Sequence, residues 1–224
     1  MAAQPPVTEN LNDPMDQIDH LLKKYPDLAA ADAAVRAAYS CLEACYSAGN
    51  KVLVCGNGGS AADSEHIVGE LMKGYFFKRP ISPELSARFN QLLPGRGQYL
   101  ADHLQGALPA ISLVSQVSLI TAFANDVAAD MIFAQQVYGY GRTGDVLIGI
   151  STSGNSINVI NALQVGRVME IKTIGLTGPL QCAMDDVCDV VIHVPGFNTP
   201  EVQERHVAVY HALCAELEER FFKR

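Results

Sequence analysis

Five short runs of almost wholly apolar residues constrain the fold of this chain more than any other feature of its sequence. Glycine, proline or polar residues bound each run, and stretches with helical spacing separate the runs. Strands that are apolar on both faces are typical of a parallel sheet that helices cover on both sides. The pattern predicts an α/β fold, a three-layer, doubly wound sandwich around a five-stranded parallel sheet. The expected strands are 51–55, 108–114, 146–151, 172–177 and 189–195.

The stretches between these runs predict the helices. Apolar residues recur there at spacings of three and four, and glycine or proline marks several helix ends. Extra helices before the first strand form a helical arm over about residues 1–50, in which residues 1–13 are polar and loose. The whole chain, residues 1–224, is predicted to be a single domain. The expected helices are 16–25, 28–48, 60–74, 99–104, 116–124, 130–140, 156–169 and 201–222.

The composition and the N-terminal sequence exclude several classes of function. The formal net charge is −8, so we expect no broad basic face for nucleic acid. The N-terminus has neither the basic start nor the apolar segment of a signal peptide. No apolar run approaches the ~20 residues that cross a membrane. We therefore expect a cytoplasmic protein that binds neither nucleic acid nor membranes.

The cysteines also favour the cytoplasm. None of them forms a CxxC pair, and each lies in an apolar or helical context. This usage indicates buried free thiols rather than disulfides or a metal cluster. Free thiols agree with a reducing cytosol. The six residues are Cys41, Cys45, Cys55, Cys182, Cys188 and Cys214.

Two loops rich in glycine and serine directly follow expected strands and precede expected helices. Residues 56–60 are GNGGS, and residues 151–156 are STSGNS. Glycine lets the backbone approach an anion closely, and a helix N-terminus offers unpaired N–H groups. Each loop alone is an ordinary turn. Because both lie at the carboxyl ends of parallel strands, where such sheets bind ligands, the pair predicts a site for a phosphate monoester.

Neither loop matches a nucleotide-binding motif. No GK[ST] is present, which excludes a Walker A loop. Gly56 and Gly58 could begin a dinucleotide fingerprint, but Ala61 occupies the third glycine position. The next strand also offers no acidic residue at the expected distance. We therefore expect no nucleotide cofactor.

Two expected helices carry groups that can move protons. His66 and Glu70 are four residues apart, so they share one face of the helix that follows the first loop. Gln203 and His211 lie on broadly one face of the last helix. A carboxylate and an imidazole brought together by two helices can act as base and acid near neutral pH. From the residues alone, packed or solvated side chains explain the same pattern.

Four runs of sequence resemble the phosphoheptose isomerases of the SIS-domain class. Together they cover about half the chain, in the same order. A GDVLIGI segment before STSGNS is typical of SIS domains, and GNGGSAAD with H-x-x-x-E and a later Q-E-x-H is typical of the phosphoheptose isomerase branch. The runs are GNGGSAADSEHIVGEL, ITAFANDVAADMIFAQQV, GRTGDVLIGISTSGNSINVINAL and VQERHVAVYHALCAELEE.

The resemblance implies a role for each candidate residue. The reaction would be an aldose–ketose isomerisation of sedoheptulose 7-phosphate to D-glycero-D-manno-heptose 7-phosphate through an enediol. Glu70 and His211 would be the acid–base pair, one acting on the carbon next to the carbonyl and the other on the carbonyl oxygen. The residues that would bind the substrate are Asn57, Gly58, Gly59, Ser60, Asp126, Ser151, Thr152, Ser153, Ser156 and Gln203.

The same resemblance implies a metal ion and a partner. Similar proteins bind zinc in this pocket, and nitrogen and oxygen donors suit that ion. Similar proteins also form homotetramers whose pockets use residues from neighbouring subunits. We therefore expect a homo-oligomer, most simply a tetramer, that binds a sugar-phosphate substrate and zinc. The matching zinc ligands are His66, Glu70, Gln203 and His211.

Some segments depart from the pattern and leave alternatives open. Residues 82–107 resemble an insertion that forms a flap or an interface element near the pocket, or else a surface loop. Ser115–Ser118 and Pro200 also differ from many relatives, which puts the identity of the sugar in doubt. Another sugar phosphate, or a non-catalytic SIS protein that regulates or assembles a partner, is the alternative. Non-catalytic relatives lack the glutamate and the last histidine, so Glu70 and His211 favour the enzyme.

Overall fold

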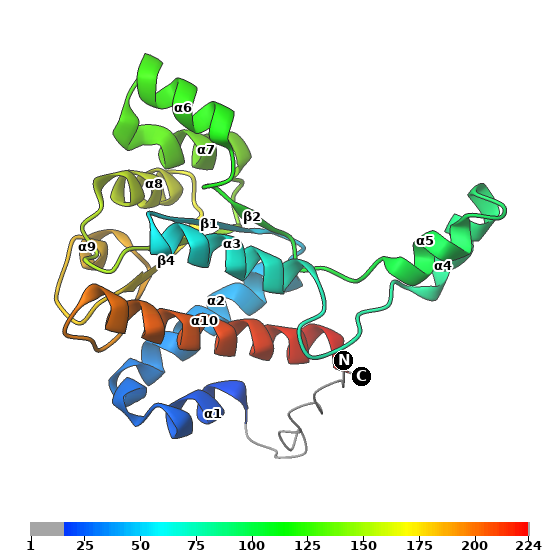
Figure 1. Ribbon diagram of the computed structural model, residues 1–224, viewed down its shortest axis with the longest axis horizontal. Coiled ribbons are helices and arrows are strands. Elements are labelled where there is room, and N and C mark those ends of the chain that lie inside the picture. Colours follow the sequence, from blue (N-terminus) through cyan, green and yellow to red (C-terminus); the bar gives the residue numbers. More distant parts are fainter. Residues whose placement is uncertain (1–15, 224) are drawn as a thin grey trace, which may run out of the picture.

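The computed structural model describes residues 16–223, so the polar arm expected at residues 1–13 lies outside the described residues. All five strands are parallel and form one sheet in the order β2-β1-β3-β4-β5 (Figure 1). This arrangement confirms the predicted α/β class and the strand count. The strands are β1 (Val52–Gly56), β2 (Ala110–Ser112), β3 (Val146–Ile150), β4 (Lys172–Thr177) and β5 (Val190–His193).

Helices cover both faces of the sheet, as the apolar strands require. Alternate strand residues point to opposite faces, so Val54 and Ile148 join one core and Leu53 and Leu147 join the other. The first face carries α1 (Gln17–Lys24), the 3-10 helix η1 (Pro26–Ala31), α2 (Asp32–Ser47), α3 (Gly59–Met72) and α10 (Thr199–Phe222). The second face carries α7 (Ile132–Tyr140), α8 (Ile157–Val168) and α9 (Met184–Val187), with α6 (Val117–Asp126) and η2 (Ala129–Met131) outside them (Figure 1).

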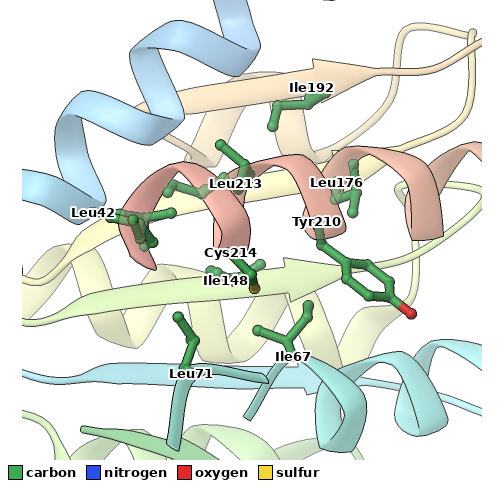
Figure 2. Close-up of a pocket in the computed structure, with 11 residues that line it drawn as sticks. Leu42, Ile67, Leu71, Ile148, Leu176, Ile192, Tyr210, Leu213 and Cys214 are labelled. Carbon is green, nitrogen blue, oxygen red and sulfur yellow. The ribbon is translucent and has the colours of Figure 1, made fainter. Parts of the chain in front are cut away.

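The long helix α10 lies across the middle of the first face. Asn198 caps its N-terminus by accepting a hydrogen bond from the Glu201 N–H, and Pro200 occupies its first turn. Leu213 and Cys214 of α10 pack between the sheet, α2 and α3 around a small apolar space (Figure 2). The Tyr210 ring borders the same space, but its hydroxyl points out of it (Figure 2). Within residues 16–223, no helix combines the length and apolarity that crossing a membrane requires.

The expected insertion forms a helical hairpin that projects from the body (Figure 1). It consists of α4 (Pro83–Leu92) and α5 (Gly97–His103) packed on each other, and α4 buries none of its residues. The sequence predicted only the second of these helices. Ser82 accepts a hydrogen bond from the Leu85 N–H and is followed by proline, which is a helix start that the many nearby prolines obscured.

Other boundaries also differ from the predictions, most clearly in two elements. The second strand, expected at 108–114, has only three residues, because it lies at the sheet edge and pairs only with β1. The helix expected at 28–48 divides into η1 and α2, since Pro26 starts a tighter 3-10 turn before the α-helix.

Candidate active site

The two glycine- and serine-rich loops leave the sheet side by side. Gly56 and Ile150 are register partners at the ends of β1 and β3, so loops 56–60 and 151–156 begin next to each other. The strand order also reverses between these two strands. Sheets of this topology bind ligands at that switch point, so the fold supports the predicted position of the site.

An amide pair ties the loops together. Asn57 Nδ2 donates to Asn158 Oδ1, and Asn158 Nδ2 donates to Asn57 Oδ1, each over 2.9 Å. The sequence had not singled out Asn158, which lies in the first turn of α8. An amide at that place, just after a loop of hydroxyls, was the signal that could have identified it.

Hydroxyl groups gather in the second loop. Ser151 Oγ lies 2.9 Å from Ser156 Oγ and 3.4 Å from Ser153 Oγ. The Thr152 carbonyl accepts a hydrogen bond from the Gly178 N–H over 3.2 Å, which fixes this loop against the end of β4. Ser60, on the neighbouring loop, is buried. These neutral donors can bind an anion without a lysine.

Two helix N-termini strengthen this preference for an anion. The N-cap residues of α3 and α8 are Gly58 and Ser156, and neither makes a side-chain capping hydrogen bond. Gly58 has a φ of 56°, a conformation that glycine adopts at no steric cost. The N–H groups at these two helix N-termini favour a bound phosphate, although in α8 the Val159 N–H already donates to Asn158 Oδ1 over 3.0 Å.

Gln203 joins this group from α10. A Cβ atom at position 59 would overlap the Gln203 amide, so the Gln203 side chain lies directly against Gly59. We call residues 57–60, residues 151–156 and Gln203 the phosphate half-site.

Three further candidates meet on α3 and α10. His66 and Glu70 are one turn apart on α3, with 3.3 Å between His66 Nε2 and Glu70 Oε1. His211 of α10 places its Nε2 atom 3.4 Å from the same His66 nitrogen. Lys73 Nζ lies 3.2 Å from the other Glu70 oxygen. We call His66, Glu70 and His211 the acid–base half-site.

Two residues that sequence reasoning missed support the His66 ring. The Tyr210 hydroxyl lies 2.8 Å from His66 Nδ1 and donates to Asp63 Oδ1 over 3.3 Å. Burial raises the pKa of Asp63, and the hydrogen bond from Tyr210 offsets part of that shift. Asp63 lies one turn before His66, and Tyr210 directly precedes His211, so helical spacing around the candidates was the available signal.

Burial sets the charge of His211. It lowers the pKa of the imidazole, the neighbouring His66 lowers it further, and Glu70 opposes the shift. The ring is therefore neutral near pH 7, with one nitrogen that donates and one that accepts. A neutral imidazole beside a carboxylate can exchange protons with a bound substrate.

The two half-sites are separated within one chain. The ten residues from Ser60 to Glu70 in α3 span about 15 Å along the helix axis. A groove of about 300 Å³ lies beside Thr152 and Ser153, and another of about 280 Å³ lies beside Tyr75 and His211. The two grooves have no lining residue in common.

Asp126 belongs to neither half-site of the same chain. It is the exposed last residue of α6 and accepts a hydrogen bond from the side chain of Asn125. In Figure 1, α6 lies beyond α7 and α8, away from α3 and α10. The contact of Asp126 with the sugar stays a prediction.

The expected zinc ligands are also divided. Gln203 lies against Gly59, which precedes His66 by about 10 Å along α3. Within residues 16–223, no group of three or more His, Cys, Asp or Glu side chains is arranged to hold a metal ion. The residue types suit zinc, but within one chain Gln203 lies apart from His66, Glu70 and His211. Zinc remains a prediction, which elemental analysis of protein purified without chelator would test.

Comparison with known proteins assigns the chain to a class of protein. A family model described as "SIS domain" matches residues 15–102 and 93–178. The chain, with its parallel sheet and the serine-rich loop at the switch point, therefore contains a SIS domain.

Individual relatives assign the chain to one family of SIS-domain proteins. A protein named phosphoheptose isomerase 2, from Campylobacter jejuni, is 40% identical over 79% of this chain and 75% of its own length. The structures of phosphoheptose isomerases from Neisseria gonorrhoeae and Francisella tularensis superpose with TM-scores of 0.68 each, at 30% and 29% identity. They cover 89% and 92% of this chain, and 95% and 100% of their own. The chain belongs to the phosphoheptose isomerase family and is an isomerase.

Proposed function

We propose that this isomerase interconverts sedoheptulose 7-phosphate and D-glycero-D-manno-heptose 7-phosphate, with Glu70 and His211 as the acid–base pair. The observation that carries the proposal is the meeting of Glu70 and His211 at one nitrogen of His66. The coarser statement, a sugar-phosphate isomerase, rests on family membership and on the phosphate half-site. The heptose is supported by the names of the relatives.

The proton transfers follow from the chemistry of the two groups. The Glu70 carboxylate removes a proton from C1 of the ketose while His211 donates a proton to the C2 carbonyl oxygen, which gives the enediol. A proton is then returned to C2 and another is removed from the C1 hydroxyl, which leaves the aldehyde at C1. The sum moves two hydrogens and changes no oxidation state overall. General acid–base catalysis of this kind contributes typically 10²–10⁴-fold in rate.

The distance between the half-sites bears on whether one chain can form a complete site. From phosphorus to C2, an extended heptulose 7-phosphate reaches about 9 Å, given bonds of about 1.5 Å. The Cα positions of Ser60, in the phosphate half-site, and of Glu70 are about 15 Å apart along α3 of one chain. We therefore propose that the phosphate half-site of one copy faces the acid–base half-site of another. A homo-oligomer is then required, and a tetramer is the state that the resemblance implies.

The test is direct observation of the product. Purified protein would be incubated with sedoheptulose 7-phosphate, and aldose anomeric protons would be followed by NMR. We expect a heptose aldose to form with the wild type and to be lost with Glu70→Gln and with His211→Ala.

Two results would contradict parts of the proposal. Binding of the heptulose phosphate without product would exclude it as the substrate, and a panel of shorter ketose phosphates would follow. Full turnover by either variant would remove that residue from the acid–base pair.

A further inference from the structure

A fully buried ion pair lies directly behind the acid–base half-site. Arg79 is 1% exposed and Glu218 is 0% exposed, and Arg79 Nε donates to Glu218 Oε1 over 2.7 Å. Removing two charges from water is costly, and the attraction between them often fails to repay the cost. The role of the pair is therefore inferred from the groups that it holds in place.

Glu218 holds the segment that follows α3. Its two carboxylate oxygens accept hydrogen bonds from three successive backbone N–H groups, those of Tyr75 (2.7 Å), Phe76 (2.5 Å) and Phe77 (3.3 Å). The Tyr75 ring consequently stays beside His211, with 5.9 Å between ring centroids. Glu218 itself lies about 10 Å beyond His211 on the same helix, α10.

Arg79 holds the end of α3. Its guanidinium donates to the Leu71 carbonyl over 2.8 Å and to the Glu70 carbonyl over 3.3 Å. These belong to the last carbonyls of the helix, which have no partner within it. The Arg79 guanidinium also lies 4.5 Å from the centre of the Phe222 ring, so it is packed as well as bonded.

We propose that Arg79 and Glu218 are positioning residues that fix Glu70 relative to His211. Arg79 binds the backbone of Glu70, Glu218 belongs to the helix of His211, and the ion pair joins the two. Neither residue reaches the substrate. Misplacing a reacting group by 1 Å can cost about 100-fold in rate. The inference rests on the proposed proton transfer between these groups and the substrate.

The principal variant is Glu218→Gln, which keeps the shape and removes the charge. Asp145→Asn is a matched control, because Asp145 is also 1% exposed and accepts from the Lys51 and Arg142 N–H groups and from Lys51 Nζ. Asp145 precedes β3, at the opposite end of the sheet from the loops. Arg79→Lys is a second variant that keeps the charge and loses the guanidinium fork.

We expect kcat to fall at least about tenfold in Glu218→Gln and in Arg79→Lys, with KM changed less than about twofold. Asp145→Asn should lose comparable thermal stability and keep kcat. Amide hydrogen exchange at Tyr75, Phe76 and Phe77 should accelerate in Glu218→Gln only. Circular dichroism would confirm that each variant is folded at the assay temperature.

The outcomes separate this inference from the proposed function. Wild-type protein that fails to convert the heptulose phosphate overturns the proposed function. If the wild type is active, a kcat in Glu218→Gln equal to that of Asp145→Asn overturns the positioning role. Unchanged exchange of the three amides in Glu218→Gln overturns it whatever the substrate proves to be.

Discussion

His206 is a histidine that folding keeps neutral. It is 0% exposed on α10, and neither ring nitrogen makes a hydrogen bond of normal geometry, although the backbone of Thr177 lies near it. Burial lowers the pKa of His206 to about 4, with a small opposing effect from Thr177. The unfolded chain, with an ordinary histidine pKa of about 6.5, therefore binds the proton more readily.

The free energy of unfolding is therefore expected to fall as the pH falls. The contribution of His206 to stability is complete above about pH 6.5 and is lost as the pH falls toward about 4, by about 3 kcal/mol in all. Denaturant melts at pH 7 and pH 4.5 would measure it. We expect His206→Leu to lose less stability than wild type between these pH values, and His103→Leu, at an exposed site, to match wild type. Equal losses in all three proteins would contradict the assignment.

At the residue scale, the sequence predicted the local placement of the candidate residues better than their side-chain contacts. Short-range spacing identified Glu70 and His66 on one helix, and the loop motifs identified the serines. Tyr210 and Glu218 were missed, because their importance depends on which segments pack together. Nothing within the local sequence shows that Glu218 will accept from the backbone of Tyr75.

At the scale of elements, the central strands were the most predictable part of the fold. Residues 172–177 were expected as a strand and form β4 with the same bounds, because a strand apolar on both faces has few alternatives. Edge strand β2 and hairpin helix α4 were less predictable. The apolar run at 108–114 extends beyond the three residues that pair with β1, whereas α4 buries no residue and so carries no strong apolar pattern.

The hairpin α4–α5 is expected to be dispensable for folding. Because α4 buries none of its residues and α5 buries only Gly97 and Ala101, replacing residues 84–105 with a short linker should change the melting temperature by less than about 4 °C, which corresponds to roughly 1 kcal/mol. Light scattering and turnover would be measured on the same protein. A smaller assembly or altered kinetics would support the flap or interface role, and unchanged values would support a surface loop. Failure to fold would contradict the expectation.

At the scale of the whole molecule, the proposed function requires two copies of the chain to bring the two half-sites together. Glu70→Gln damages only the acid–base half-site, and Ser153→Asp damages only the phosphate half-site by adding a charge that repels phosphate. If each site uses two copies, refolding an equal mixture should restore about a quarter of wild-type turnover, since a quarter of the sites combine two intact halves. A mixture as inactive as its components, or a 24.1 kDa monomer in light scattering, would contradict a shared site.

The bridge at the base of the α4–α5 hairpin makes this position suitable for inserting another domain. Pro80 and Gln105 form an antiparallel bridge, and the Gly106 N–H donates to the Arg79 carbonyl over 2.6 Å, so the two ends of the segment are already held together. The entropy of closing a loop grows only slowly with its length. A fluorescent domain or an epitope can therefore be spliced between these ends without being threaded through the sheet. Such a reporter would be joined to the chain directly beside Arg79, which binds the backbone of Glu70 in the proposed acid–base pair.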